Sequence, residues 1–163
     1  MNTKEALKIG MDLAEFVCQA YLADLTDADL MKRAAPGINH INWQVGHIIH
    51  SGYRHIEDSL PGSMPPLPAD FAAKYAKDAA TNDDPKSFYP KEKLLAFHKT
   101  QREAQLAALD KLSDADLDKP SPEAYHSYAP TVGSLFSLQG SHWLMHCGQW
   151  AVVRRQLGHP PLF

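Results

Sequence analysis

The segment "VGSLFSLQGSHWLMHCGQWAVVRRQL" (132–157) predicts the longest helix of the chain and determines the expected fold. Thr131 is a suitable N-cap for it, and Gly158, followed closely by two prolines, is typical of a helix C-terminus. His142 and His146 are four residues apart, so a helix places both side chains on one face. The segment therefore predicts a long helix that presents two imidazoles side by side.

Apolar residues recur at helical spacing in three other long segments, 3–25, 41–60 and 91–112. The connection between the second and the third of them (61–90) contains six prolines and is long enough to run back along a helix. No segment shows a convincing strand pattern. We therefore predict an all-α fold, a four-helix bundle with a long crossover connection, formed by one domain over residues 1–163.

Shorter elements are expected in the connections. "LTDADL" (25–30) and "LSDADL" (112–117) match each other, and we interpret each as one capped helical turn that follows a long helix. Thr26 or the aspartate after it would cap the first turn, and Thr3 would cap the first long helix. A short helix is predicted over residues 69–77.

Composition excludes several classes of protein. The formal net charge is -3, so no basic surface for nucleic acid is expected, and two cysteines are too few for a disulfide-rich secreted scaffold. No apolar run reaches the length of a transmembrane helix, about 18 residues. Charged residues interrupt the first helix, which leaves no signal-peptide core. We therefore expect a cytoplasmic protein that binds neither nucleic acid nor a membrane.

Two histidines at this helical spacing can share one divalent ion, as they do in the HExxH zinc helix. No glutamate lies between His142 and His146, which argues against a metalloprotease. Four of the nine histidines lie in "GINHINWQVGHIIHSGYRH" (37–55) and could supply a third ligand, but periodicity does not choose among them. Helical position places His47 and His50 away from the apolar stripe and predicts that they face solvent.

Two stretches resemble the DinB-like (DinB/YfiT) family of four-helix-bundle metalloproteins. "NHINWQVGHIIHSGYRHIEDSLPG" (39–62) resembles its second helix, in which a tryptophan precedes a Gly-His pair and the helix closes near Pro-Gly. "PTVGSLFSLQGSHWLMHCGQWAVVRRQLGHPP" (130–161) resembles its last helix, with an H-x-x-x-H-x-G-Q core and an Arg-Arg-x-Leu-Gly ending. The resemblance implies a bundle, often dimeric, with three histidines around a divalent metal. Carried over by position, these ligands are His47, His142 and His146.

The resemblance also implies a function, because characterised members of the family include transferases and isomerases that depend on a low-molecular-weight thiol. We expect a divalent-metal enzyme (zinc, nickel or iron) of this kind, acting as a homodimer on a small-molecule substrate. Two alternatives stay open: a metal-dependent hydrolase with Glu57 or Asp58 as its base, and a non-enzymatic, stress-associated metal-binding dimer. Three neutral imidazoles do not identify the metal, and the apolar residues of the first and third long helices could serve the core or a dimer face.

The roles of four further residues are also of interest: three lie near the histidine pair in the sequence, and one follows His47. Trp143 stands where the family often has an acidic or small polar residue, and it would either pack in the core or line a pocket. Cys147 is expected to be buried rather than a ligand. Gln149 would support the histidines or join two helices by a hydrogen bond. Arg54 would contact an anion or remain solvated.

Overall fold

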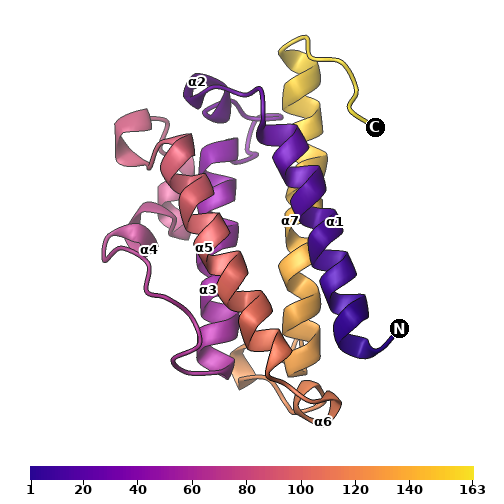
Figure 1. Cartoon of the computed structure of the whole chain (residues 1–163). Coiled ribbons are helices and arrows are strands. Elements are labelled where there is room, and N and C mark those ends of the chain that lie inside the picture. The colour runs from indigo at the N-terminus through magenta and orange to yellow at the C-terminus, as the bar shows by residue number, and fades with distance from the viewer.

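The computed structural model describes all residues, 1–163, and its four long helices are α1 (Thr3–Leu22), α3 (Ile41–Ser59), α5 (Lys91–Asp110) and α7 (Val132–Gln156). They form one bundle in which α1 packs along α7, while α3 contacts both α7 and α5 (Figure 1). The only β-type pairing is an isolated bridge between Pro120 and Thr131. The predicted all-α bundle is confirmed. None of the helices combines the length and apolar character needed to cross a bilayer.

The long crossover allows two consecutive long helices, α3 and α5, to run in the same direction. In Figure 1, α1 and α7 run upward whereas α3 and α5 run downward, so the chain returns over residues 60–90 before α5 begins. The predicted helix at 69–77 is only the single turn α4 (Phe71–Lys74), with a 3-10 turn at Lys77–Thr81. Ala76 separates them because its backbone is extended (φ -67°, ψ 160°).

Side-chain caps define most helix starts. The two matching hexapeptides form capped turns as predicted, α2 (Asp27–Leu30) with Thr26 as its N-cap and α6 (Asp114–Leu117). The N-cap of α1 is Asn2 rather than Thr3, because the Asn2 side chain accepts the backbone N–H of Glu5. Both residue types can cap a helix, and asparagine, the one found here, is the more strongly preferred.

The α1–α7 pair is the closest contact in the bundle. A Cβ on Gly140 would lie 2.8 Å from the carbonyl oxygen of Gly10, so glycine is required for this approach. Arg154, which belongs to the Arg-Arg ending of α7, is 1% exposed and donates to the Tyr21 carbonyl at 3.0 Å and to the carboxylate of Asp24. This arginine joins the C-terminal ends of the two helices.

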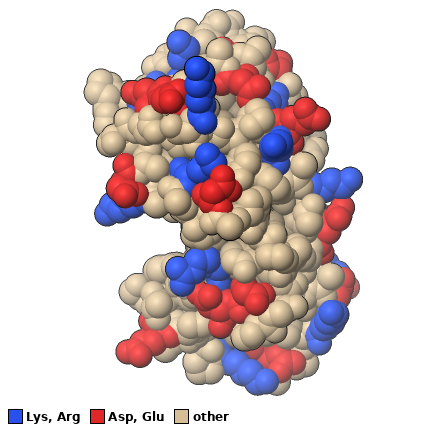
Figure 2. Space-filling model, turned by 90° about the vertical axis from the view of Figure 1, so that its left-hand side faces the viewer, with Lys and Arg blue, Asp and Glu red and all other residues tan.

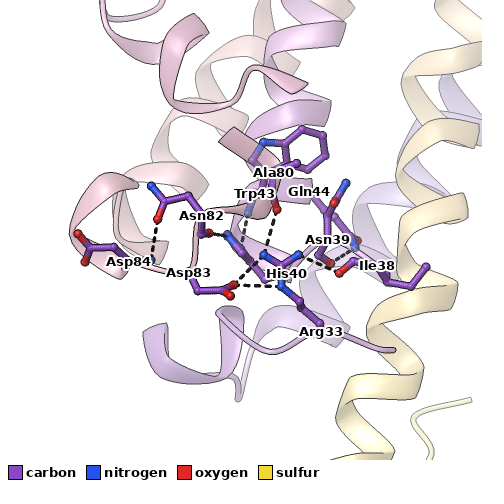
Figure 3. Close-up of polar contacts among 10 residues, drawn as sticks. All are labelled: Arg33, Ile38, Asn39, His40, Trp43, Gln44, Ala80, Asn82, Asp83 and Asp84. Atoms are coloured by element: carbon purple, nitrogen blue, oxygen red, sulfur yellow. Dashed lines mark hydrogen bonds and ion pairs between the residues drawn. The ribbon is translucent and has the colours of Figure 1, made fainter. Parts of the chain in front are cut away.

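The crossover is fastened to the start of α3 (Figure 3). His40 caps the helix: its Nδ1 accepts the backbone N–H of Trp43 at 3.0 Å, and its Nε2 lies 3.1 Å from the Asn82 carbonyl. Arg33 donates to the carboxylate of Asp83 at 2.7 Å. The crossover therefore covers a side of α3 that periodicity assigns to solvent.

Candidate metal centre

The structure brings His47 of α3 together with His142 and His146 of α7. One ring nitrogen from each lies within 4.8 Å of the other two. Nε2 of His142 is 3.3 Å from Nε2 of His146. Two nitrogens bound to one zinc ion at about 2.0–2.1 Å with a tetrahedral angle would be roughly 3.3–3.4 Å apart. The His142–His146 pair has the spacing of two ligands of one ion, and His47 lies close enough for the three side chains to hold a single divalent ion.

His47 is half-buried, so the expectation that it faces solvent is wrong. The indole of Trp43 stacks on its ring, with centroids 4.8 Å apart and planes 6° from parallel. His50, for which the same exposure was predicted, is half-buried as well. The physical reason is the crossover, which covers this side of α3 and which helical periodicity does not reveal.

Gln44 determines the tautomer of His146. Its Oε1 accepts the indole N–H of Trp150 at 2.8 Å, and because tryptophan only donates, this contact identifies the oxygen. The same oxygen lies 3.1 Å from Nδ1 of His146, so Nδ1 must carry the proton. The lone pair of His146 is therefore on Nε2, which faces His142. Hydrogen bonds of this kind orient metal-binding histidines in proteins.

The environment keeps all three imidazoles neutral, the form that binds a metal. Burial lowers the pKa of His142 to about 3 and that of His146 to about 4, and proximity to other histidines adds to both shifts. The pKa of His47 is also lowered, mainly by burial. No carboxylate pairs with the three rings to oppose this effect.

A cavity of about 790 Å³ reaches the cluster at His47, which is part of its wall, whereas His142 and His146 do not line it. It is bounded by α3, by residues 75–81 of the crossover and by residues 124–128 before α7. Figure 2 shows the molecule hollowed at mid-height along one edge, between an upper and a lower part. The cavity is large enough for a small organic molecule.

Neither carboxylate considered as a catalytic base is free. Glu57 accepts the backbone N–H groups of Gly62 at 2.7 Å and of Met64 at 3.0 Å, which closes the turn after α3. Asp58 accepts from Arg54 at 3.0 Å and from the hydroxyl of Tyr125 at 2.5 Å. No aspartate or glutamate lines the cavity.

The structure shows the contacts of Trp143, Cys147 and Gln149, whose roles the sequence left open. Trp143 is buried and packs on His98. Cys147 is buried as expected, with its sulfur 3.2 Å from that of Cys18. Gln149 accepts from the Gln44 amide at 2.7 Å, so it supports the residue that orients His146.

The sequence pattern contained Gln44 and Gly46 but did not indicate their roles. A Cβ at Gly46 would lie 2.2 Å from the ring of Tyr75, so the glycine of the Gly-His pair makes room for a residue of the crossover. The tyrosine hydroxyl then donates to the side chain of Asn42 at 3.2 Å and accepts the Tyr89 N–H at 3.0 Å. The glycine thus helps to form the cavity wall.

Comparison with known protein families identifies the family of the chain. The sequence model of the DinB superfamily matches residues 15–150, which include all three histidines of the cluster. A search of curated proteins finds no significant match.

Proposed function

The chain belongs to the DinB superfamily, and from this premise we propose that it is a divalent-metal-dependent enzyme that uses a small thiol. The observation that carries the proposal is the cluster of His47, His142 and His146, whose ring nitrogens converge within 4.8 Å next to a cavity. The metal would be zinc, nickel or iron, which imidazole ligands suit. A divalent ion held there supplies a Lewis acid that lowers the pKa of a thiol and favours the thiolate near neutral pH.

The protein's own groups prepare this site. Gln44 holds the Nε2 lone pair of His146 toward His142, and Trp43 fixes the ring plane of His47. Three protein ligands leave a position open for a further ligand, which is typical of a catalytic site. The cavity would hold the electrophilic substrate of an S-transferase or isomerase.

Two observations favour thiol chemistry over the alternatives. The hydrolase considered from the sequence would use Glu57 or Asp58 as its base, whereas both are engaged in other hydrogen bonds and no carboxylate lines the cavity. A non-enzymatic metal-binding protein needs no substrate cavity beside the metal.

We also propose that the protein acts as a homodimer. Large apolar side chains are exposed on two adjacent helices, α1 and α7: Ile9, Leu13, Phe16, Met145 and Val152 are 46–62% exposed. The spacing of these residues places each set on one face of its helix. The third long helix, α5, exposes no comparable residue, so of the two roles left open for its apolar residues we assign them to the core and place the dimer face on α1 and α7.

Elemental analysis of untagged protein, purified without added metal, tests the site. We expect about one zinc, nickel or iron per chain, lost in His47→Ala and in His142→Ala. His126→Ala is the matched control, because His126 bonds the Ser121 carbonyl outside the cluster. Metal that survives both cluster substitutions, or its absence from the native protein, would refute the proposal. Consumption of an electrophile by glutathione, compared with hydrolysis of an ester, then separates thiol transfer from hydrolysis.

A further inference from the structure

The cavity beside the histidine cluster carries charge of one sign. Its charged lining residues are Arg54 and Lys77, and both are cationic at neutral pH. Lys77 forms no ion pair. The guanidinium of Arg54 donates one hydrogen bond, to Asp58, although a guanidinium carries five N–H donors. The side chain is 57% exposed, so its other N–H groups are free to bind a ligand that enters the cavity from solvent.

Asp58 holds this arginine in place without neutralising the cavity. Its carboxylate lies one helical turn after Arg54 on α3 and also accepts the hydroxyl of Tyr125, which lines the cavity. Arg54, Lys77 and Asp58 together carry a net charge of +1. This balance suits a monoanion such as a carboxylate better than a dianionic phosphate. The planar fork of arginine also matches the two oxygens of a carboxylate.

The position of Arg54 relative to His47 guides the choice of probe length. The two residues are seven positions apart on α3, which is two helical turns and about 10 Å along the helix axis. Both line the same cavity. The two side chains are therefore attached about 10 Å apart along the helix, and probes of about this length suit a test of both ends.

We propose that the cavity binds an acidic thiol, whose sulfur lies at the histidine cluster and whose carboxylate is bound by Arg54 with help from Lys77. The inference rests on the proposed function for the sulfur end, since the proposed metal is what would hold the sulfur at the cluster. The carboxylate end rests on the charges of the cavity alone.

Calorimetric titration of zinc-loaded protein tests the carboxylate end with two probes of matched length, 8-mercaptooctanoate and 8-mercapto-1-octanol. We expect the acid to bind about ten- to a hundredfold more tightly, the range of a charge-assisted hydrogen bond. Arg54→Met should remove most of this preference without changing the affinity for the alcohol, and Arg54→Lys should keep part of it. Arg155→Met, an exposed arginine on α7, is the matched control. Equal binding of acid and alcohol to the native protein would overturn the inference.

Octanoate separates this inference from the proposed function. If the protein holds zinc as proposed, 8-mercaptooctanoate binds more tightly than octanoate, and His142→Ala removes that difference. If zinc is not held but acids still bind better than alcohols, the proposed function fails while the Arg54 subsite stands. If the acid preference appears only for octanoate added beside 2-mercaptoethanol, the carboxylate belongs to the electrophile and the assignment to the thiol is wrong.

Discussion

The side-chain oxygen of Gln44 lies 3.1 Å from Nδ1 of His146, so a residue of α3 orients a histidine of α7. His47 belongs to α3 as well, only three residues further along. The relative position of the two helices therefore determines both the third histidine of the cluster and the tautomer of His146. The site depends on the packing of α3 against α7 as much as on the histidines themselves.

The first prediction concerns this hydrogen bond. Gln44→Leu removes the acceptor for His146 and Trp150, and we expect metal affinity to fall about 10- to 100-fold, the usual effect of losing such a partner. Competition with a chromophoric chelator measures the change. Gln44→Glu keeps the acceptor for His146 and Trp150 but loses the amide donor to Asn39 and Gln149, so it should retain only part of the affinity. A loss in Gln149→Leu as large as in Gln44→Leu would contradict the role assigned to Gln44.

The second prediction concerns Gly46. Gly46→Ala places a methyl group against the ring of Tyr75, and we expect the free energy of unfolding to fall by about 1–3 kcal/mol, the cost of overpacking a core. Urea denaturation measures it. In Gly10→Ala the new methyl group meets nothing within 4 Å, so the higher helix propensity of alanine should stabilise the protein by about 0.5–1 kcal/mol. Equal effects of the two substitutions would exclude the contact with Tyr75.

The third prediction concerns acid stability. Burial, reinforced by the charge of Arg33, lowers the pKa of His40 to about 4 in the folded protein, although Asn82 and Asp83 oppose the shift. The unfolded chain keeps a value near 6.5. Between these values the unfolded state binds a proton that the folded state does not, so stability falls as the pH is lowered through this window and is unaffected by His40 above it.

Comparison with His40→Asn isolates this effect, because asparagine can cap α3 but does not titrate. Between pH 7 and pH 5 the native protein should lose about 2 kcal/mol more of its free energy of unfolding than the variant. The charged groups that face His40 are Arg33 and Asp83, and both are present in the native protein and in the variant. Parallel pH profiles of the two proteins would show that His40 titrates normally in the fold.

The fourth prediction concerns assembly. Leu13→Glu introduces a charge at the centre of the exposed apolar residues of α1, and we expect it to convert the homodimer into a monomer. Light scattering coupled to size-exclusion chromatography measures the mass. Ala107→Glu, on an exposed position of α5, should leave the dimer intact. A native protein that is already monomeric would exclude the proposed interface.

Local patterns predicted the fold to within a few residues at most helix ends. The starts of α3 and α7 agree with the predictions at Ile41 and Val132 because caps and periodicity act over short distances. The short helix of the crossover was overestimated because Ala76 adopts an extended conformation that no local signal marks. Its neighbours are good helix formers, so propensity alone favours a longer helix.

The candidate site could be predicted only in part from the sequence. The spacing of His142 and His146 indicated a pair, whereas His47 was chosen by resemblance, since its helical position indicated solvent. Its burial depends on Trp43 and on the distant crossover, and such contacts leave no periodic trace in the sequence. The positive charge of the cavity could not be predicted for the same reason. Arg54 and Lys77 line one cavity only because the crossover brings the chain back along α3.

The histidine cluster stands entirely on helices, whereas the cavity is bordered by α3 on one side and by connections on the others. The histidines stand on α3 and α7, while residues 75–81 and 124–128 are connections between helices. Connections tolerate substitution, insertion and deletion better than packed helices do. Evolution can therefore alter the shape and charge of the cavity while the three imidazoles keep their positions, so that one ancestral scaffold can diverge toward different substrates by exchanging its connections.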